Sequence, residues 1–383
     1  MREGWSKKRL RDVADVFAGQ SAPQKQEDYS SNGTPFIKAG NLYDLINGTD
    51  ENSIQKVTDF SAQKNGLKKY KSGSVLFAKS GMSCLKGYVY IMQNDCYVVS
   101  HLAIIQPKAD VISPYLKYHF MYHKPCLLSK DTAYPSISIT DILNYVILVP
   151  DNSKQKQITS ELDMITELIS KYDEQLKELD KLSQSIFYDM FGDPVENEMG
   201  WEISTIGTAC KLKSGNSETN NSKEGTLPYI KVSDMNLPLN EKYIRNSLLS
   251  VDYESNKKNI IPKGSTIFPK RGGAIFTNKK RITIEEICCD LNIMAVIPEK
   301  EIHPEYLYMY FVLIDFSKLP NGSSVPQINN KDIGPLNISL PPLSLQQSFA
   351  RKIEAIEAMK SKVKEAKKEA ETLLAARMQY WFE

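Results

Sequence analysis

The stretch from Gln155 to Phe191 constrains this chain more than any other. Its apolar residues recur in alternating steps of four and three, at Ile158, Leu162, Ile165, Ile169, Tyr172, Leu176 and Leu179. Such heptad spacing is typical of a helix that pairs with another helix. Neither Gly nor Pro interrupts the stretch, so we expect one helix of roughly 55 Å, at about 1.5 Å per residue. That length exceeds several-fold the helices of ordinary domains, so the domains must be arranged around it.

The same pattern returns at the end of the chain, in residues 346–383. Apolar residues that lie 191 positions after members of the first set are Phe349, Ile353, Ile356 and Val363. The first helix carries 4 Lys or Arg against 8 Asp or Glu, whereas residues 346–383 carry 8 against 6. Because one helix is acidic and the other basic, we expect the two to pair with each other.

The segments that precede the two helices also repeat with this offset. GSVLFAKSG (73–81) returns as GSTIFPKRG (264–272), and Pro107, Tyr115 and Pro150 return as Pro298, Tyr306 and Pro341. Short apolar or alternating runs separated by Gly, Pro, Asn and Ser indicate β-strands and turns. A repeat of this length is a duplicated domain rather than a solenoid unit. We therefore predict an α+β fold in four parts: a first β-rich domain (1–154), a central long helix (155–191), a second β-rich domain (192–345) and a C-terminal long helix (346–383).

Composition narrows the class of protein. The 383 residues have a net charge of +2 and six Cys, with no CxxC spacing, which indicates neither a disulfide framework nor a zinc site. There is no apolar run of about eighteen residues and no signal peptide at the first residues, so we expect a cytoplasmic protein.

Motifs of catalysis are absent from the sequence. It contains no GxGxxG, no GxxxxGK[ST] and no HExxH. His119 and His123 have helical spacing, but no third ligand is near in the sequence, so we interpret them as partly exposed helix residues. We therefore predict no catalytic residue, no metal site and no cofactor in this chain.

A basic turn follows a strand in each half and is the strongest candidate for binding. The first holds Lys79 and Ser80 before Gly81, and the second holds Lys270 and Arg271 before Gly272. Glycine lets the backbone approach a ligand closely. Lys and Arg suit phosphate oxygens and the O6/N7 edge of guanine. An ordinary solvated turn remains the alternative for each copy.

Two further sets of polar residues recur in both halves. One pairs Lys38 and Asn41 with Lys231 and Asp234. The other sets Tyr134, Ser136 and Ser138 against Ser323, Ser324, Gln327 and Asn329. The positions of these polar residues match between the halves, but the side chains differ. This is expected if two copies of one scaffold bind two different targets. Neutral drift of surface loops gives the same pattern.

The chain resembles the DNA-specificity subunit of Type I restriction–modification systems. The resemblance depends on the Gly-Trp openings at 4–5 and 200–201, the two basic turns, MFGDP (190–194), PQI followed by KDI (326–333) and Pro341-Pro342-Leu343 with Gln346. It implies two target-recognition domains separated by two antiparallel coiled-coil helices, each domain reading half of a bipartite, asymmetric DNA site. It also implies a non-catalytic chain whose helices bind two modification subunits. These carry S-adenosylmethionine, and restriction subunits can join them.

The long helices have apolar residues outside the heptad seam. These are Leu168, Phe187, Met190, Phe191, Met378, Trp381 and Phe382. Two paired helices cover only a narrow stripe of each other. We therefore predict that these residues form the interface with partner subunits.

Two other functions remain open at this point. One is a scaffold or adaptor whose helices bind an unrelated partner and whose domains do not bind DNA. The other is a specificity module for a different restriction class. Neither the DNA target nor the length of its unread gap is legible in the sequence, because loop geometry and indirect readout determine both.

Overall fold

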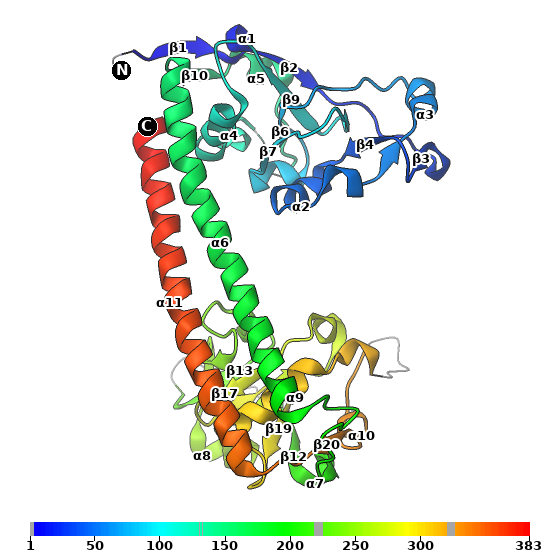
Figure 1. Cartoon of the computed structure of the whole chain (residues 1–383), viewed down its shortest axis with the longest axis vertical. Coiled ribbons are helices and arrows are strands. Elements are labelled where there is room, and N and C mark those ends of the chain that lie inside the picture. The colour runs from blue at the N-terminus through cyan, green and yellow to red at the C-terminus, as the bar shows by residue number, and fades with distance from the viewer. Residues whose placement is uncertain (1–3, 130, 132, 218–224, 320–325) are drawn as a thin grey trace. The chain divides into compact units, whose positions relative to one another are not determined.

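The computed structural model describes residues 4–129, 131, 133–217, 225–319 and 326–383 (Figure 1). The chain divides into two compact units: unit 1 is Met1–Lys171 with Ala366–Glu383, and unit 2 is Tyr172–Glu365. Both boundaries fall inside the long helices α6 (Asn152–Phe191) and α11 (Leu343–Phe382). Each unit therefore contains one β-rich domain and a segment of both long helices.

Capping residues mark the two ends of the first long helix, and both long helices are slightly longer than expected. Each has 40 residues and begins three residues before the expected range, at Asn152 rather than 155 and at Leu343 rather than 346. Asp151 precedes α6, and its Oδ1 accepts the N–H of Lys154 at 2.8 Å, which caps the first turn. Gly192 ends α6 with φ of +76°, a conformation that suits glycine at a helix C-terminus.

The domain of unit 1 is built from small sheets, in which most strand pairs are antiparallel. The main sheet has the order β2–β9–β6–β7, and a second sheet has the order β3–β5–β4–β8, in which β4 and β8 run parallel. Its strands are β1 (Ser6–Arg9), β2 (Ala14–Ala18), β3 (Tyr29–Ser30), β4 (Thr34–Ile37), β5 (Lys56–Val57), β6 (Val75–Ala78), β7 (Val89–Ile91), β8 (Tyr97–Val98), β9 (Leu102–Pro107) and β10 (Val146–Val149), with β1 paired to β10. Its helices are α1 (Leu10–Val13), α2 (Leu42–Ile46), α3 (Asp59–Lys64), α4 (Ser113–Tyr122) and α5 (Ile139–Asn144).

Unit 2 repeats this plan. Its sheets have the orders β12–β19–β16–β17–β14 and β15–β13–β18, and β11 pairs with β20. The strands are β11 (Ile203–Thr205), β12 (Cys210–Ser214), β13 (Leu227–Ile230), β14 (Tyr243–Ile244), β15 (Leu249–Val251), β16 (Thr266–Pro269), β17 (Arg281–Thr283), β18 (Cys288–Cys289), β19 (Ile293–Pro298) and β20 (Asn337–Ser339). The helices are α7 (Ile206–Ala209), α8 (Tyr253–Asn256), α9 (Pro304–Leu313) and α10 (Asn330–Ile333). Strands β16 and β19 and helix α9 lie 191 positions after β6, β9 and α4.

A buried glutamine joins the first turn of each long helix to its own domain. Gln155 Nε2 donates to the carbonyls of Asp110 (2.8 Å) and Pro150 (2.9 Å), and its Oε1 accepts the N–H of Ile112 at 3.0 Å. Gln346 makes the equivalent bonds to Glu301 (2.9 Å), Pro341 (2.8 Å) and His303 (2.8 Å). Both glutamines are fully buried. Because burying an amide is costly unless it is hydrogen-bonded, these bonds fix how each helix leaves its domain.

The last turn of each long helix packs into the domain of the other repeat. In unit 1 the ring of Phe382 lies 5.5 Å from that of Tyr115, and in unit 2 Phe191 lies 4.8 Å from Tyr306. Phe191 also contacts Phe349 at 5.4 Å. Neither repeat can therefore complete its own core without the helix of the other.

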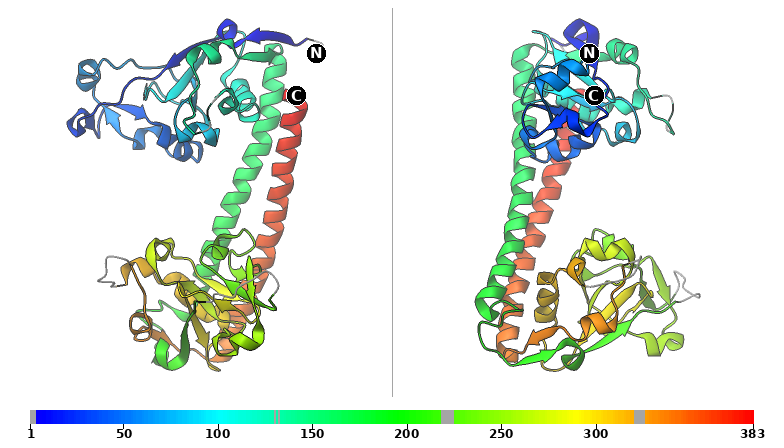
Figure 2. Two further views of the ribbon diagram at one scale, coloured as in Figure 1. Left: turned by 180° about the vertical axis from the view of Figure 1, so that it is seen from behind. Right: turned by 90° about the vertical axis from the view of Figure 1, so that its right-hand side faces the viewer.

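Polar contacts define the direction in which the helices pair within each unit. In unit 1 the guanidinium of Arg377, late in α11, bonds to Glu161, early in α6, and Trp381 Nε1 donates to the same carboxylate at 3.1 Å. In unit 2 Lys360, in the first half of α11, lies 2.6 Å from Asp180, in the second half of α6. Within each unit the two helix segments lie side by side and run antiparallel (Figures 1 and 2).

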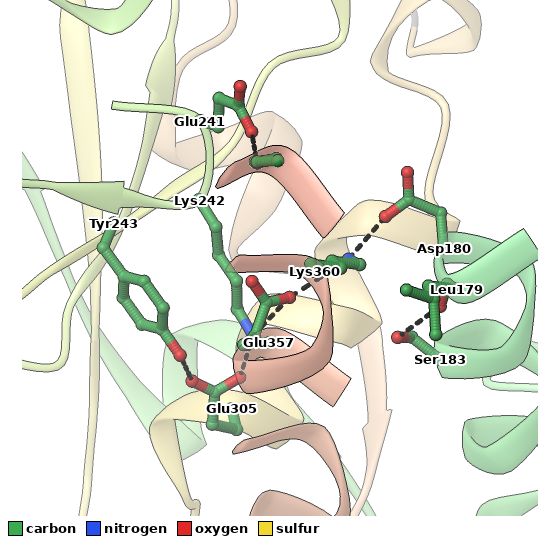
Figure 3. Close-up of polar contacts among 10 residues, drawn as sticks. Leu179, Asp180, Ser183, Glu241, Lys242, Tyr243, Glu305, Glu357 and Lys360 are labelled. Carbon is green, nitrogen blue, oxygen red and sulfur yellow. Dashed lines mark hydrogen bonds and ion pairs between the residues drawn. The ribbon is translucent and has the colours of Figure 1, made fainter. Parts of the chain in front are cut away.

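A chain of alternating charges joins the domain of unit 2 to its helices (Figure 3). Lys242 Nζ, beside β14, lies 2.7 Å from Glu305 on α9 and 3.7 Å from Glu357 on α11. Lys360 Nζ then lies 3.1 Å from Glu357 and 2.6 Å from Asp180 on α6. In unit 1 the positions equivalent to Glu305, Glu357 and Lys360 hold Pro114, Thr166 and Ile169, so this network has no counterpart there. No helix in the described ranges is long and apolar enough to cross a membrane.

Truncating the buried aromatic end of a long helix tests this packing. We expect Phe382→Ala to lower the free energy of unfolding by about 3–5 kcal/mol, because it leaves a cavity beside Tyr115. Tyr380→Ala is the matched control, since Tyr380 is 53% exposed. Urea unfolding of the full chain measures both variants, and equal stabilities would contradict the packing described here.

Candidate nucleic-acid interface

In unit 1 the predicted basic turn and the predicted polar run lie together. The turn follows β6, and the isolated bridge Ser80–Ser136 joins it to the run that precedes α5. Three backbone hydrogen bonds surround this bridge: Lys79 N–H to His101 O (2.9 Å), Ile137 N–H to Lys79 O (2.7 Å) and Gly81 N–H to Pro135 O (2.9 Å). Main-chain hydrogen bonds therefore hold the basic turn against the polar run, although the two are far apart in the sequence. These bonds do not depend on which side chains the two segments carry.

Unit 2 has the same backbone frame 191 positions later. The bridge joins Arg271 to Gln327. The three surrounding bonds are Lys270 N–H to Asn292 O (2.7 Å), Ile328 N–H to Lys270 O (2.9 Å) and Gly272 N–H to Pro326 O (2.8 Å). We call residues 79–81 with 134–138 the recognition surface of unit 1, and residues 270–272 with 326–329 that of unit 2.

Apart from Lys79, which is half-buried, the polar side chains on the surface of unit 1 are small or aromatic. Ser80 Oγ lies 2.8 Å from His101 Nδ1, where the end of β6 meets the start of β9. Tyr134 is 83% exposed, and Ser136 is exposed as well. Ser138 caps α5 instead, since its Oγ accepts the N–H of Asp141 at 3.0 Å.

The side chains on the surface of unit 2 are larger and more basic. Arg271 is exposed, whereas Lys270 Nζ donates to Ser214 Oγ at 2.7 Å. Burial lowers the pKa of the Lys270 ammonium, and the charge of Arg271 lowers it further. Gln327 Nε2 donates to Asn329 Oδ1 at 2.7 Å. Ser323 and Ser324, predicted to belong here, lie outside the described residues.

The second predicted pair has mainly a structural role. Asn41 Oδ1 accepts the N–H of Lys38, and Asp234 Oδ2 accepts the N–H of Lys231, each at 2.8 Å. Both side chains therefore close the turn that carries them. Asp234 is 1% exposed, so the prediction that its carboxylate contacts DNA is corrected. Asn41 makes the same closing bond, while Lys38 and Lys231 remain partly exposed.

Sequence reasoning missed two residues of these surfaces. His101 and Asn292 lie just before β9 and β19, and their carbonyls accept the N–H groups of the basic turns. They are 191 positions apart, so the repeat offset applied to every polar residue would have identified them.

The interpretation of His119 as partly exposed is wrong. His119 is 3% exposed and lies 5.7 Å from Phe382, ring to ring, because α4 turns it toward the C-terminal end of α11. Burial lowers its pKa to about 3. Across the described ranges, no group of three or more His, Cys, Asp or Glu is placed to hold a metal ion.

The apolar residues predicted to bind partner subunits need correction. Phe187, Phe191, Met378, Trp381 and Phe382 are each less than 9% exposed, because the chain itself buries them in its domain cores. Their burial explains the apolar surplus without a partner. Leu168 is 41% exposed and Met190 is half-buried, so these two still present apolar surface on α6.

A buried lysine supports the segment after the basic turn of unit 2. Lys280 Nζ donates to Asn278 Oδ1 (2.6 Å) and Ile314 O (2.8 Å) and lies 4.2 Å from the centre of the Phe316 ring. Lys280 is 2% exposed. Burial lowers the pKa of its ammonium to about 7.

The chain is similar to specificity proteins of type I systems. The family model for the Type I restriction modification DNA specificity domain matches residues 2–180 and 198–372. The MjaIX specificity subunit of Methanocaldococcus jannaschii is 27% identical over 194 residues, covering 48% of this chain and 43% of that relative, so the alignment spans less than half of its length. A second protein of that organism, named for the MjaX type I restriction enzyme specificity subunit, is 22% identical over 97% of this chain and 93% of its own.

Solved structures show the same fold. A chain from a type I R-M system matches with a TM-score of 0.60 at 16% identity, covering 99% of this chain and 97% of the other. The S subunit from M. genitalium matches with a TM-score of 0.53 at 16% identity, covering 99% and 96%.

The pKa of Lys280 makes stability depend on pH. The folded chain releases this proton near pH 7 and the unfolded chain only near 10.5, so the unfolded state binds more protons between these values. Stability should therefore rise with pH across this window, by at most about 1.4 kcal/mol per unit. Denaturant unfolding of the parent and of Lys280→Met measures the difference. Parallel stability curves for the two proteins would contradict a lowered pKa.

Proposed function

The chain belongs to the Type I restriction modification DNA specificity domain family, and from that premise we propose that it directs a modification and restriction complex to a bipartite, asymmetric DNA site. Each unit reads one half of the site, and the chain itself carries out no chemistry. The observation that carries this proposal is the doubled recognition surface, which has one backbone frame and two sets of side chains.

The differences between the surfaces suit two different half-sites. The equivalent positions carry different side chains in the two units. Arg271 corresponds to Ser80, Gln327 to Ser136 and Asn292 to His101. Arg pairs with the O6/N7 edge of guanine, and Asn or Gln with the N6/N7 edge of adenine, while Ser and His bind other groups. A site read through these groups is asymmetric because the two sets cannot recognise the same bases.

We propose that two modification subunits bind the long helices. Four exposed apolar residues of the long helices form equivalent pairs 191 positions apart, Leu168 with Met359 and Leu182 with Leu373, each between 41% and 49% exposed. Unit 1 holds Leu168 and Leu373, and unit 2 holds Leu182 and Met359. Each unit thus presents the same kind of apolar surface, which fits two copies of one partner.

The remaining components of the complex follow from this role. We propose that S-adenosylmethionine is bound by the modification subunits rather than by this chain. Restriction subunits join where the system also cleaves DNA. The complex works in the cytoplasm, where chromosomal DNA is accessible. A coiled-coil scaffold without DNA binding is disfavoured, because the family match covers both domains.

Removing the basic side chains of one turn tests the assignment of DNA recognition. We expect Lys270→Ala with Arg271→Ala to weaken binding of the assembled complex to its target by about 1–3 kcal/mol for each base that these side chains read, and to relax one half-site only. The measurement combines salt-titrated DNA binding with the methylated motif found genome-wide. If the two side chains bind phosphates instead, the variant will bind all sequences more weakly alike and its affinity will depend less on salt.

The matched control removes two lysines elsewhere in unit 2. Lys177→Ala with Lys181→Ala lowers the charge by the same amount on the exposed face of α6. If the turn variant and this control bind target DNA equally well, the turns are ordinary surface loops.

Placing charge on the exposed apolar pair of one unit tests the partner surface. We expect Leu182→Asp with Met359→Asp to leave a complex with one modification subunit instead of two, because burying the new carboxylates is costly. Native mass spectrometry measures the composition. Val195→Asp is the control, since Val195 is 74% exposed but outside the long helices. A full complement of modification subunits in the first variant would rule out this surface.

A further inference from the structure

An exposed apolar residue occupies the same place beside both recognition surfaces. Leu85 lies on the short helix η4 (Met82–Lys86), and Phe276, 191 positions later, lies on η8 (Gly272–Thr277). They are 42% and 57% exposed. Their neighbours Cys84 and Ile275 are 2% and 1% exposed, so each short helix buries one apolar side chain and presents the next to solvent.

Both short helices end in a hydrogen-bonded turn. Each ends at a residue in the left-handed conformation, Gly87 (φ 65°) and Asn278 (φ 52°), whose N–H bonds to the carbonyl of Cys84 or Ile275. Asn278 is held in turn by Lys280, and its Oδ1 accepts the N–H of Phe316 at 3.0 Å. An exposed side chain on such a support has a fixed direction and loses little entropy when it is buried by a ligand.

The surroundings of these two residues suit a polyanion. Lys79 precedes Leu85 by six residues, Lys86 follows it, and the side chain of Lys124 packs over Gly87 at the end of η4. In unit 2, Lys270 and Arg271 precede Phe276, and exposed Lys318 lies on η9 (Phe316–Lys318), which contacts η8. An apolar side chain flanked by cations is what a protein needs to enter a stacked duplex while holding its phosphates.

We propose that Leu85 and Phe276 are wedge residues, each of which inserts between two stacked base pairs of the half-site read by its unit. The proposal rests on the function proposed above and adds a mechanical step to it. A modification subunit must extrude its target base from the duplex, which costs unstacking energy. An apolar wedge opens one base step and kinks the DNA, so the binding energy of this chain lowers that cost.

The two wedges should differ in depth. A flat aromatic ring stacks on any base, whereas a leucine side chain covers a smaller area of the base faces. Unit 2 should therefore open its step further than unit 1. Substituting Phe276 by Tyr keeps the ring and should keep the opening, whereas Phe276→Ala should abolish it.

The test uses the assembled complex with its modification subunits and duplexes that carry the methylated motif. The fluorescent base analogue 2-aminopurine is placed at one position at a time, leaving out the base that is methylated, and its emission rises when stacking is disrupted. We expect the parent to give a rise at one step in each half-site. Leu85→Ala should abolish the rise in one half-site, and Phe276→Ala should abolish it in the other, while Phe276→Tyr retains it. Both alanine variants should also bind target DNA more weakly.

An exposed aromatic residue on another helix of unit 1 provides the control. Phe60→Ala removes an aromatic side chain that is 78% exposed on α3, outside both the recognition surface and η4, and should leave both rises unchanged. The wedge proposal is overturned if the parent binds its target with no rise, if both alanine variants keep the parental rises, or if they lose a modification subunit instead. Failure of the parent complex to bind any DNA would overturn the proposed function as well, which separates the two failures.

Discussion

The structure depends on the exchange of aromatic helix ends between the two repeats. Phe191 completes the core around Tyr306, and Phe382 completes the core around Tyr115, while Gln155 and Gln346 fix where each helix starts. Each domain is therefore held by the beginning of one long helix and the end of the other. Because burial of a large aromatic side chain contributes several kcal/mol, neither repeat reaches full stability alone.

This arrangement separates stability from recognition. Apolar packing and main-chain hydrogen bonds build the frame, and the same three bonds fix the turn after β6 and the turn after β16. The side chains that project from this frame, such as Ser80 and Arg271, contribute little to the core. Changes there can alter the sequence that is read without disturbing the fold, as expected for functional loops on a rigid scaffold.

The repeat and the long helices could be predicted from the sequence, because heptad spacing and a constant offset are visible without coordinates. The sequence did not allow us to predict which individual side chains are buried or what they contact. Phe191 and Phe382 read as surplus apolar surface, since nothing local shows that they enter the other repeat's domain. His119 looked exposed because its aromatic neighbours come from α11 as well as α4. Asp234 was predicted to bind DNA because the sequence does not show that its carboxylate accepts the N–H of Lys231 in its own turn.

The central claim is that each unit reads its own half-site through an independent surface. The most direct measurement is the methylated motif, determined genome-wide, of a chain in which residues 197–342 are replaced by residues 1–151. The splice points are equivalent, because Gly4 and Trp5 then take the place of Gly200 and Trp201 and Gly192 still ends α6. Phe191 meets a tyrosine in either context, since Tyr115 takes the place of Tyr306. We expect a motif in which both halves carry the half-site of unit 1. An active complex that keeps the parental second half-site would contradict the claim.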